Sequence, residues 1–372
     1  MQLYTWLDFV VIVLAGVHFG VPLVYYWVVK NRWMKLPWNI KRDFNYLPKV
    51  SIIVPTYNEA KLIWDKLEDL KRQDYPRDRF EIIVVDSAST DGTPDIVKDW
   101  ACQNPDIDLK LIIEPIRRGK AHALNTALQY ATGDIVIITD VDAKWNSKDT
   151  LRKAVSYFAD PNIGAVSCIK IPAGQEHTIE QCYRQYYNII RIGESKKYAT
   201  PIFHGELAAF RKDLLLKVGG FPLNVGADDS HTATKIALLG YRAIIPEDIL
   251  VTELVPKEQY GKWRIRRAQH LIQHFTKTLK HIHKAPKQYK LILTTETYLH
   301  LLNPWILTTA TALAITTAIA YKTILSITLL TTYLILHTYR PLRTWTTTQH
   351  YLVVAAIRNI KKPELIWEKQ QK

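Results

Sequence analysis

Two aspartates separated by one residue, Asp140 and Asp142, directly follow the run DIVIIT, which has the composition of a buried strand. Both side chains can therefore reach the space beyond the end of that strand. Carboxylate oxygens are preferred ligands of Mg²⁺ and Mn²⁺. The spacing predicts a divalent-cation site, and the alternative is a solvated pair of acids in a loop. Three more acidic residues end or follow similar runs, namely Glu59, Asp86 and Asp91.

Strands and helices must alternate along the chain to position these acids. The strand-like runs are KVSIIVPTYNE, FEIIVVDSAST, LKLIIEP and DIVIITDVD. Between them, residues 58–72, 93–101 and 120–132 carry apolar residues at the three- and four-residue spacing of helices. This order predicts an α/β fold with a mainly parallel, Rossmann-like sheet, whose ligands lie at the carboxyl ends of the strands.

The charge of the chain favours an anionic partner. The 49 lysines and arginines exceed the 35 acidic residues by 14, which suits nucleic acid, a phosphorylated substrate or an anionic membrane face. Arg118, Gly119 and Lys120 precede a predicted helix, where backbone N–H groups and a lysine favour phosphate, although a merely charged surface has the same pattern. The three cysteines lack CxxC spacing, which argues against a zinc site or a disulfide framework and fits a reducing compartment.

Three apolar stretches predict membrane-spanning helices. The first, Asp8–Val29, is long enough to cross a bilayer and lacks the basic start and cleavage site of a signal peptide. The second, Thr297–Tyr321, and the third, Thr323–Tyr339, are joined only by Lys322 and predict a hairpin, in which Pro304 should kink the second helix. A buried core helix is the alternative for the first stretch.

Basic residues flank the predicted membrane helices on one side. They are Lys30, Arg32, Lys35, Lys41 and Arg42 after the first helix, and Arg340 and Arg343 after the third. The positive-inside rule then places the N-terminus outside and the middle segment in the cytoplasm. We therefore expect an integral protein of the plasma membrane. Its expected parts are an N-terminal transmembrane helix (1–30), a cytoplasmic domain (31–257), basic interfacial helices (258–296), a transmembrane hairpin (297–340) and a cytoplasmic amphipathic tail (341–372).

Six motifs occur in order between residues 51 and 242. They are SIIVPTYNEA, VVDSASTDGT, RRGKAHALNTAL, DIVIITDVDAKW, HGELAAFRKDLLLKVGGF and GADDSHTATKIALLGYR. In this order the chain resembles the family 2 glycosyltransferases with a GT-A fold. The membrane hairpin and the basic helix before it narrow the resemblance to the cellulose synthase and hyaluronan synthase branch. The resemblance implies a nucleotide-sugar donor and a divalent metal, Mg²⁺ or Mn²⁺.

The resemblance assigns most candidate site residues to the donor. Asp142 is the firmer metal ligand, with Asp140 beside it. A cation and basic side chains would neutralise the leaving diphosphate. The implied donor-binding residues are Pro55, Thr56, Tyr57, Glu59, Asp86, Lys120, Asp140, Arg264, Arg266 and Arg267. Turn and capping roles are the alternatives for Tyr57, Glu59 and Asp86.

Transfer to a hydroxyl group needs a general base. Asp229 is the candidate, and Asp228 precedes it at the start of a predicted helix, where family members usually carry Glu-Asp; helix capping is its alternative role. Neighbouring carboxylates raise one pKa and a helix N-terminus lowers it, so the sequence leaves the value open. A single base without a nucleophile implies inversion at the anomeric carbon. The candidate acceptor-binding residues are Gly205, Glu206 and Trp263.

The Gln-x-x-Arg-Trp string of the family is altered in this chain. Gln259 to Trp263 reads Gln-x-x-Lys-Trp, which would make Trp263 an aromatic platform for the acceptor. The surrounding family pattern overlays better on WRIRRAQH, where Arg266 takes the place of the arginine and Arg267 that of the tryptophan. Both registers stay open. A third interpretation, a basic amphipathic helix that lies on anionic lipid, also stays open.

We expect a membrane-anchored, inverting, metal-dependent glycosyltransferase. Three membrane helices are too few to enclose a channel, which favours transfer of one sugar to a polyprenyl-linked saccharide or lipid carrier in glycan or N-glycan biosynthesis. GDP-mannose is the first choice of donor and a UDP-sugar is the second. One alternative is a processive polysaccharide synthase that uses a UDP-sugar, and another is a non-catalytic membrane-anchored scaffold. No nucleic acid is expected as a partner, and the oligomeric state is open.

Overall fold

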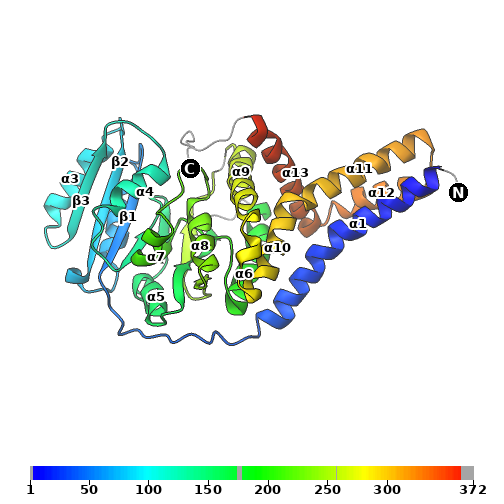
Figure 1. Cartoon of the computed structure of the whole chain (residues 1–372). Helices are drawn as coiled ribbons and strands as arrows, with labels where there is room; N and C mark the ends of the chain where they lie inside the picture. The colour runs from blue at the N-terminus through cyan, green and yellow to red at the C-terminus, as the bar shows by residue number, and fades with distance from the viewer. Residues whose placement is uncertain (1–2, 174–177, 257, 362–372) are drawn as a thin grey trace.

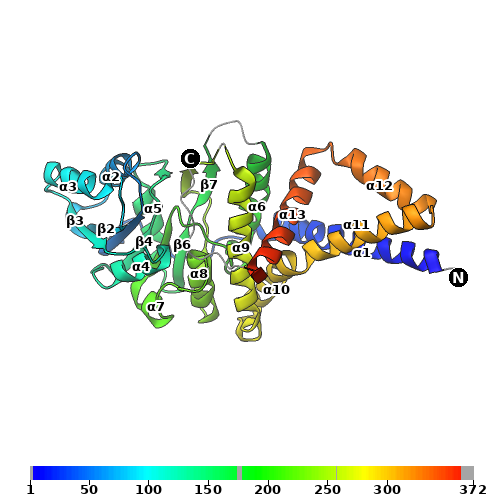
Figure 2. The same cartoon turned by 90° about the horizontal axis from the view of Figure 1, so that it is seen from above.

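The computed structural model of the chain describes residues 3–173, 178–256 and 258–361. An α/β body carries the sheets, and a helical stalk projects from one side of it, with the N-terminus at its tip (Figures 1 and 2). Helices α6 (Thr178–Lys197), α9 (Tyr260–Leu279) and α10 (Lys287–Leu301) lie between the sheet and the stalk. The stalk is therefore joined to the body through helices rather than through the sheet.

The main sheet has seven strands in the order β3-β2-β1-β4-β8-β6-β9. Strands β3, β2, β1 and β4 run parallel, whereas β8 is antiparallel to both β4 and β6. The strand bounds are β1 Val50–Thr56, β2 Phe80–Ser87, β3 Asp108–Glu114, β4 Ile135–Ile138, β6 Ile163–Ser167, β8 Ala208–Arg211 and β9 Arg242–Ile244. The predicted α/β fold with a mainly parallel sheet is confirmed, and the four predicted strands are adjacent parallel strands of it.

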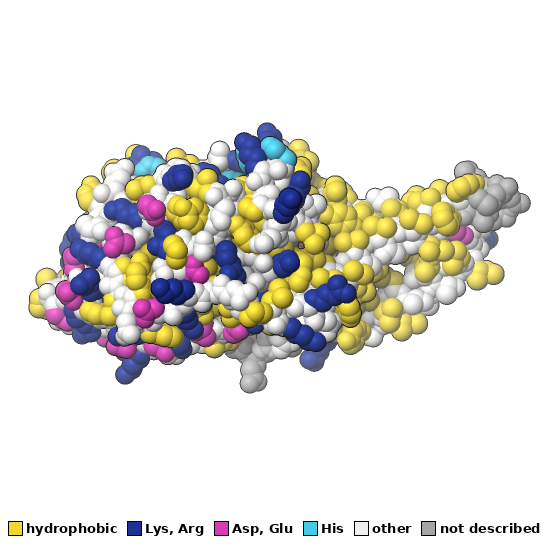
Figure 3. Space-filling model, turned by 60° about the horizontal axis from the view of Figure 1, so that its bottom comes forward, with side chains coloured by type: hydrophobic (Ala, Val, Ile, Leu, Met, Phe, Trp, Pro, Cys, Tyr) yellow, Lys and Arg dark blue, Asp and Glu magenta, His cyan; other side chains and the backbone are white. Residues whose placement is uncertain are grey.

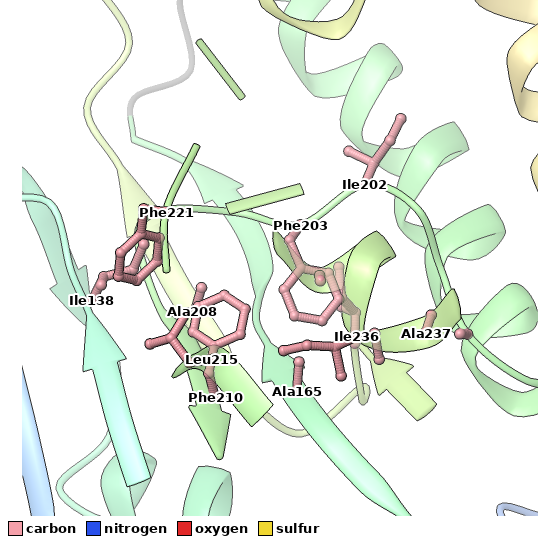
Figure 4. Packing of buried hydrophobic residues seen from close by; sticks show 14 of the residues in the cluster. Ile138, Ala165, Ile202, Phe203, Ala208, Phe210, Leu215, Phe221, Ile236 and Ala237 are labelled. Carbon is pink, nitrogen blue, oxygen red and sulfur yellow. The ribbon is translucent and has the colours of Figure 1, made fainter. Parts of the chain in front are cut away.

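Alternate residues of the central strands pack on opposite faces of this sheet. In β1, Ile53 belongs to the apolar cluster on one face, whereas Ile52 and Val54 belong to the cluster on the other. Figure 4 shows part of the first cluster, in which Phe203 and Phe210 pack near Ala208 and Ile236. Burial on both faces explains why these strands read as unbroken isoleucine and valine runs.

A second, three-stranded sheet supports the loop after β4. Its strands are β5 Ala143–Trp145, β10 Leu250–Glu253 and β7 Ile169–Pro172, in the order β5-β10-β7. Strand β5 begins directly after Asp142, and its pairing with β10 holds the end of the Asp140–Asp142 turn. Beneath this turn, the buried ammonium of Lys66 donates a hydrogen bond to the carbonyl oxygen of Ala143 at 2.8 Å. The two aspartates are thus carried on a supported turn.

Helices α2 (Ile63–Lys71), α3 (Thr93–Gln103) and α4 (Lys120–Leu128) follow the first three strands, as predicted. Helix α2 begins at Ile63 rather than at Asn58, because Asn58 has a left-handed backbone with a φ of 55°. The backbone N–H of Asn58 donates to Ser89 Oγ at 2.7 Å, so this segment is a loop packed on the end of β2. The remaining body helices are α5 Thr150–Ser156, α7 Lys212–Lys217 and α8 Asp228–Leu238.

Four helices form the stalk and its return to the body. They are α1 Leu3–Val28, α11 Asn303–Ala320, α12 Ile324–Leu336 and α13 Arg340–Lys361. Helices α1 and α11 lie side by side in both views (Figures 1 and 2). Within the described ranges, Trp6–Trp33, which is α1 with the π-helical turn after it, is the one unbroken helix long and apolar enough to cross a membrane. Of the predicted cytoplasmic tail, residues 362–372 lie outside the described residues.

The other two predicted spans are not single long helices. Residues 297–321 fall in α10 and α11, which are bent by 40° and pass the same test only as a pair. Pro304 lies in the first turn of α11, where a proline costs no hydrogen bond, so the break falls before it rather than inside a helix. Helix α12 has 13 residues, about 20 Å of helix, against about 30 Å for the hydrocarbon core of a bilayer. Two further membrane crossings therefore stay predictions.

Polar side chains inside the stalk tie its helices together. Asp8 Oδ1 accepts hydrogen bonds from Thr323 Oγ1 at 3.0 Å and from Ser326 Oγ at 2.6 Å, which links α1 to the start of α12. Farther along α1, Trp345 Nε1 donates to His18 Nε2 at 3.0 Å, which links α1 to α13. Buried polar groups need such partners, so these bonds set how the stalk helices pack.

Candidate active site

A cavity of 590 Å³ opens at the carboxyl ends of β1 and β4. Its wall is built by the ends of these strands, the segments 117–120, 202–206 and 226–230, and the helices α6, α9 and α13. The sequence predicts ligands at this edge of a parallel sheet, and the structure has its cavity there. Most of the predicted site residues line this one cavity. They are Pro55, Thr56, Tyr57, Glu59, Lys120, Asp140, Asp142, Gly205, Glu206, Asp228, Asp229, Trp263, Arg264, Arg266 and Arg267.

Asp86 is the predicted residue that does not line the cavity. It is fully buried, and its carboxylate accepts hydrogen bonds from Thr56 Oγ1 at 3.1 Å and from the backbone N–H of Ser89 at 2.9 Å. These bonds hold the loop after β2 against the end of β1. On the open side of the same rim, the guanidinium of Arg117 lies 3.8 Å from the centre of the Tyr57 ring. The rim therefore presents an aromatic and a cation, with Asp86 behind it.

Lys120 and Asp140 form an ion pair inside the cavity. Lys120 begins α4 and its Nζ lies 2.6 Å from Asp140 Oδ1. Burial disfavours the ammonium, but the carboxylates of Asp140, Asp228 and Asp229 outweigh this and raise the pKa of Lys120. Lys120 is therefore a permanent positive charge at the centre of a group of acids.

Gly205 marks the point where three of these charged side chains meet. A Cβ atom at this position would lie 2.8 Å from Lys120 Nζ, 3.4 Å from Asp140 Oδ2 and 3.5 Å from Asp229 Oδ2. The carbonyl oxygen of Gly205 also accepts a hydrogen bond from the backbone N–H of Asp140 at 3.2 Å. The absence of a side chain at Gly205 lets a cation and two carboxylates converge on one small volume.

The two aspartates at the start of α8 have unusual surroundings for acids. Burial raises the pKa of Asp228 to about 7, against the attraction of Lys120. Burial also raises the pKa of Asp229, although the backbone N–H of Ser230 donates to its Oδ1 at 2.6 Å. Within the described part of the chain, Asp228 Oδ2 has no hydrogen-bond partner. The pair is suited to exchanging protons near neutral pH.

Glu206 belongs to a buried ionic network that the sequence does not reveal. Its Oε1 lies 2.5 Å from Lys170 Nζ and 3.7 Å from Arg267 Nη2, and both cations also contact Glu253 of β10. Burial raises the pKa of Glu206 to about 7, and its Oε2 has no hydrogen-bond partner among the described residues. Arg184 of α6 extends the network by pairing with Glu253 at 3.2 Å. The network binds β7, β10, α6 and α9 together beneath the cavity.

Helix α9 carries the residues of both possible registers of the altered string on one face. Trp263 is 1% exposed, and the guanidinium of Arg267, one turn later, lies 4.6 Å from its ring centre. Arg264 is paired with Glu180 at 3.4 Å, and its guanidinium lies 3.8 Å from the ring centre of Tyr183. The two registers assign the tryptophan of the family string to Trp263 or to Arg267. These two side chains lie against each other in the structure, so either register places the residue at the same point. Arg264 and Arg267 already form ion pairs with Glu180 and Glu253, respectively.

Sequence reasoning missed the contribution of α6 to the cavity. Tyr183, Arg184, Tyr187 and Arg191 all line it. These residues carry no strand-end motif, and their three- and four-residue spacing is shared by any amphipathic helix. Only the packing of α6 against the sheet reveals their part in the site.

Comparisons with known proteins identify the class of this protein. Residues 51–219 match the family model described as Glycosyl transferase family 2. The solved structure of mannosyltransferase PcManGT from Pyrobaculum calidifontis in complex with GDP-Man and Mn²⁺ is 55% identical, with a TM-score of 0.89, and the match covers 95% of this chain and 99% of that one.

Two more distant proteins share parts of the same pattern. Poly-beta-1,6-N-acetyl-D-glucosamine synthase of Staphylococcus epidermidis is 26% identical over 72% of this chain, and the match spans 66% of that synthase. S. aureus TarS 1–349 is 20% identical with a TM-score of 0.51, over 81% of this chain and 90% of that one, a likeness of fold alone.

The predicted family is confirmed by these matches. An identity of 55% over nearly the whole of two chains extends far beyond the six motifs and includes the stalk as well as the body. The alternative of a non-catalytic scaffold loses its basis, because the motifs belong to an enzyme family and converge on one cavity. The chain belongs to glycosyl transferase family 2, and it is a glycosyltransferase.

Proposed function

We propose that this glycosyltransferase moves mannose from GDP-mannose to a lipid-linked saccharide, with a divalent metal and with inversion at the anomeric carbon. The mannosyltransferase that is 55% identical and was solved with GDP-Man and Mn²⁺ supports the donor and the metal. The observation that carries the proposal is the convergence of Lys120, Asp140 and Asp229 on Gly205. It brings a cation for the diphosphate, a carboxylate for a metal and a base for the acceptor into one cavity.

Asp140 and Asp142 would hold Mg²⁺ or Mn²⁺, because both carboxylates line the cavity and oxygen is the preferred ligand of these ions. The described residues contain no group of three or more histidine, cysteine or acidic side chains arranged around a metal. Two carboxylates suit Mg²⁺, which usually takes its other ligands from water and substrate phosphates. When bound, the ion would offset the charge that develops on the leaving diphosphate.

The donor would lie along the rim formed by the end of β1 and the segment 117–120. We assign Pro55, Thr56, Tyr57 and Glu59 to its nucleoside and Lys120 to its diphosphate. Asp86 would act indirectly, by holding the loop behind Thr56. On α9, Arg266 lines the cavity and would contact the diphosphate, with Arg264 and Arg267 behind it in their ion pairs. Arg264 and Arg267 are given this supporting role because glutamates already pair with both of them.

Asp229 would act as the general base. Its carboxylate takes the proton of the acceptor hydroxyl while that oxygen forms a bond to the anomeric carbon. The bond from this carbon to the diphosphate oxygen breaks, its electron pair leaves with GDP, and the configuration inverts. Asp228 would tune the proton affinity of Asp229, because the two carboxylates are adjacent and buried. Glu206 and Trp263 would line the acceptor side.

The stalk would anchor the enzyme in a membrane. Hydrophobic side chains cover much of the stalk surface in Figure 3, whereas lysines and arginines are spread over the body. Exposed apolar residues of α1 include Phe9, Leu23 and Trp27, which is costly in water. Lys30 and Arg32 follow at the base of the stalk. We infer an integral protein of the plasma membrane with a cytoplasmic body, of the cellulose synthase-like branch.

The proposal is tested with the detergent-purified full chain and a panel of nucleotide sugars. Release of nucleoside diphosphate is measured with Mn²⁺, with Mg²⁺ and with a chelator, in the presence and absence of a polyprenyl-linked acceptor. We expect release from GDP-mannose alone among the donors, enhanced by the acceptor and abolished by the chelator. Release from a UDP-sugar but not from GDP-mannose would contradict the donor assignment.

A processive polysaccharide synthase is the second candidate. The observation that favours it is the 26% identity to a poly-beta-1,6-N-acetyl-D-glucosamine synthase. Both candidates use the same catalytic residues, so variants do not separate them. Product length does: mass spectrometry of the reaction with UDP-N-acetylglucosamine would give a ladder of polymers for the synthase. A single added mass from GDP-mannose supports the transferase.

A further inference from the structure

The segment that carries Asp229 is held by a helix outside the main sheet. This segment, residues 224–229, ends in the first turn of α8, and we call it the base loop. The backbone N–H of Gly226 in this loop donates a hydrogen bond to Gln273 Oε1 of α9 at 2.9 Å. The position of Asp229 therefore depends on where α9 lies as well as on the sheet.

The contact between α9 and the base loop is close. A Cβ atom at Gly226 would lie 2.2 Å from Cδ2 of the His270 ring and 2.5 Å from its Nε2 atom, so the ring fits in this place only against a glycine. One turn after Gln273, Lys277 Nζ donates a hydrogen bond to the carbonyl oxygen of Asn224 at 2.7 Å. Residues spaced by three and four share one face of a helix. One face of α9 thus holds the base loop over about two turns.

Gln273 also connects the base loop to α13. Its Nε2 atom donates a hydrogen bond to Asn359 Oδ1 at 3.0 Å. Asn359 Nδ2 in turn donates to the carbonyl oxygen of Gln269 at 2.9 Å, which fixes the amide of Asn359 on α9. Helices α9 and α13 lie side by side in both views (Figures 1 and 2). The amide group of Gln273 therefore bridges two elements, with its oxygen on Gly226 and its nitrogen on Asn359.

Helix α13 reaches from this bridge to the stalk. Near its start, Trp345 Nε1 donates a hydrogen bond to His18 Nε2 of α1 at 3.0 Å. Trp345 and Asn359 are about 21 Å apart along one continuous helix. Between them α13 packs on α9 through a small cluster of buried apolar side chains. One rigid element is thus bonded to the stalk near one end and to the base loop, through Gln273, near the other.

We propose that Gln273 and Asn359 are positioning residues, which hold the base loop and with it Asp229 in the geometry that transfer requires. The inference rests on the proposed function, in which Asp229 takes the proton of the acceptor hydroxyl group. Gly226 closely precedes Asp229 in the chain, so a shift of its backbone moves the carboxylate. Neither positioning residue lies on the strands β1 and β4 or on α4, which carry the proposed donor and metal ligands. The two residues therefore act on the chemical step and not on donor binding.

The test measures steady-state transfer from GDP-mannose to octyl mannoside, with Mn²⁺ and the purified full chain. Gln273→Met keeps the length of the side chain but removes the oxygen that accepts from Gly226. We expect kcat to fall by about 10- to 100-fold, the effect of a base misplaced by about 1 Å or less. The KM for GDP-mannose should stay the same. Gln273→Glu should restore most of the lost kcat, because a carboxylate oxygen can still accept from the Gly226 N–H.

Thr276→Ala on α9 and Arg358→Ala on α13 are the matched controls. Both side chains are exposed, so kcat should not change in either variant. Asn359→Ala removes the partner of Gln273 on α13 and should lower kcat less than Gln273→Met does. Because the two residues act through one chain of hydrogen bonds, the double variant should lose no more than Gln273→Met alone. Additive losses, or an unchanged kcat in Gln273→Met, would overturn the inference.

Hydrogen exchange separates this inference from the proposed function. The bond to Gln273 protects the amide of Gly226, so a peptide that covers the base loop reports on the bridge without donor or turnover. Gln273→Met and Asn359→Ala should both speed exchange in this peptide, and Thr276→Ala should not. Unchanged exchange in both variants would refute the inference even if GDP-mannose is the wrong donor. Faster exchange with an unchanged kcat, in a protein that turns over GDP-mannose, would refute the positioning role and leave the proposed function standing.

Discussion

Replacing Gly205 by alanine should separate the chemistry of the site from its folding. The new methyl group would lie 2.8 Å from Lys120 Nζ, 3.4 Å from Asp140 Oδ2 and 3.5 Å from Asp229 Oδ2. Only the first distance is too short for ordinary contact, so the ammonium must move. Because Nζ is the end of a flexible side chain, the backbone can stay in place. The fold should therefore tolerate the substitution.

The size of the effect follows from what the displaced ammonium loses. Its contact with Asp140 is 2.6 Å long, and a hydrogen bond to a charged group contributes about 1.5–3 kcal/mol. If Lys120 meets the leaving diphosphate, its displacement removes one electrostatic contact in the transition state, which typically costs about 10²–10³ in kcat. We expect kcat/KM for GDP-mannose to fall about 100-fold. The melting temperature should fall by no more than about 5 °C.

The assay measures steady-state transfer and thermal unfolding on the same preparation. Gly133→Ala is the matched control, because its Cβ would lie 2.6 Å from the backbone nitrogen of Ser51 and 2.7 Å from the carbonyl carbon of Val50. Backbone atoms of β1 cannot give way cheaply, so this variant should lose stability, although Gly133 does not line the cavity. Unchanged kcat/KM in Gly205→Ala, or a loss of stability as large as in Gly133→Ala, would refute the reasoning.

Four further outcomes are expected. Asp229→Asn should lower transfer by at least about 100-fold, because general-base catalysis contributes about 10²–10⁴, while fluorescence titration shows GDP still bound. Transfer should fall as acid protonates the two aspartates at the start of α8, since burial raises the pKa of Asp228 to about 7 and also raises the pKa of Asp229; a flat profile of kcat/KM from pH 5 to 9 would contradict this. In chemical denaturation, the ligand-free protein should become less stable as the pH rises from about 4 to about 7, because the folded state then still holds protons that the unfolded chain has released. Glu253→Gln should cost about 3 kcal/mol in chemical denaturation, since it leaves Lys170, Arg184 and Arg267 short of a partner. Asp95→Asn, in an exposed pair, should cost under about 0.5 kcal/mol.

The edge of the sheet at which the cavity opens could be predicted because local patterns define it. The isoleucine and valine runs of β1, β2 and β4 mark strands buried on both faces, and parallel strands bring their carboxyl ends to one edge. Tyr57 and Asp140 are therefore expected near each other, independently of how the other helices and strands pack. The start of α2 could not be predicted in the same way, because Asn58 bonds to the distant residue Ser89.

The acidic residues at the strand ends look alike in the sequence and differ in the structure. Asp86 is buried with all its bonds inside the protein, whereas Asp140 and Asp142 line the cavity. The difference arises from the neighbours of each strand end. Asp86 accepts hydrogen bonds from Thr56, at the end of β1, and from Ser89, in the loop after β2, whereas the small second sheet holds the turn of the other two aspartates. Except for Ser89, these neighbours come from distant parts of the chain.

By itself, the sequence determined the family, the α/β fold, the order of the motifs and an apolar N-terminal helix, because contiguous residues encode each of these. Only the tertiary structure decided the break before Pro304, the stacking of Arg267 on Trp263, the ionic network around Glu206 and the part of α6 in the wall of the cavity. Each of these depends on side chains from helices and strands that meet only after folding. Spacing along a chain cannot describe contacts of that kind, since the physical partner of each group lies on another element.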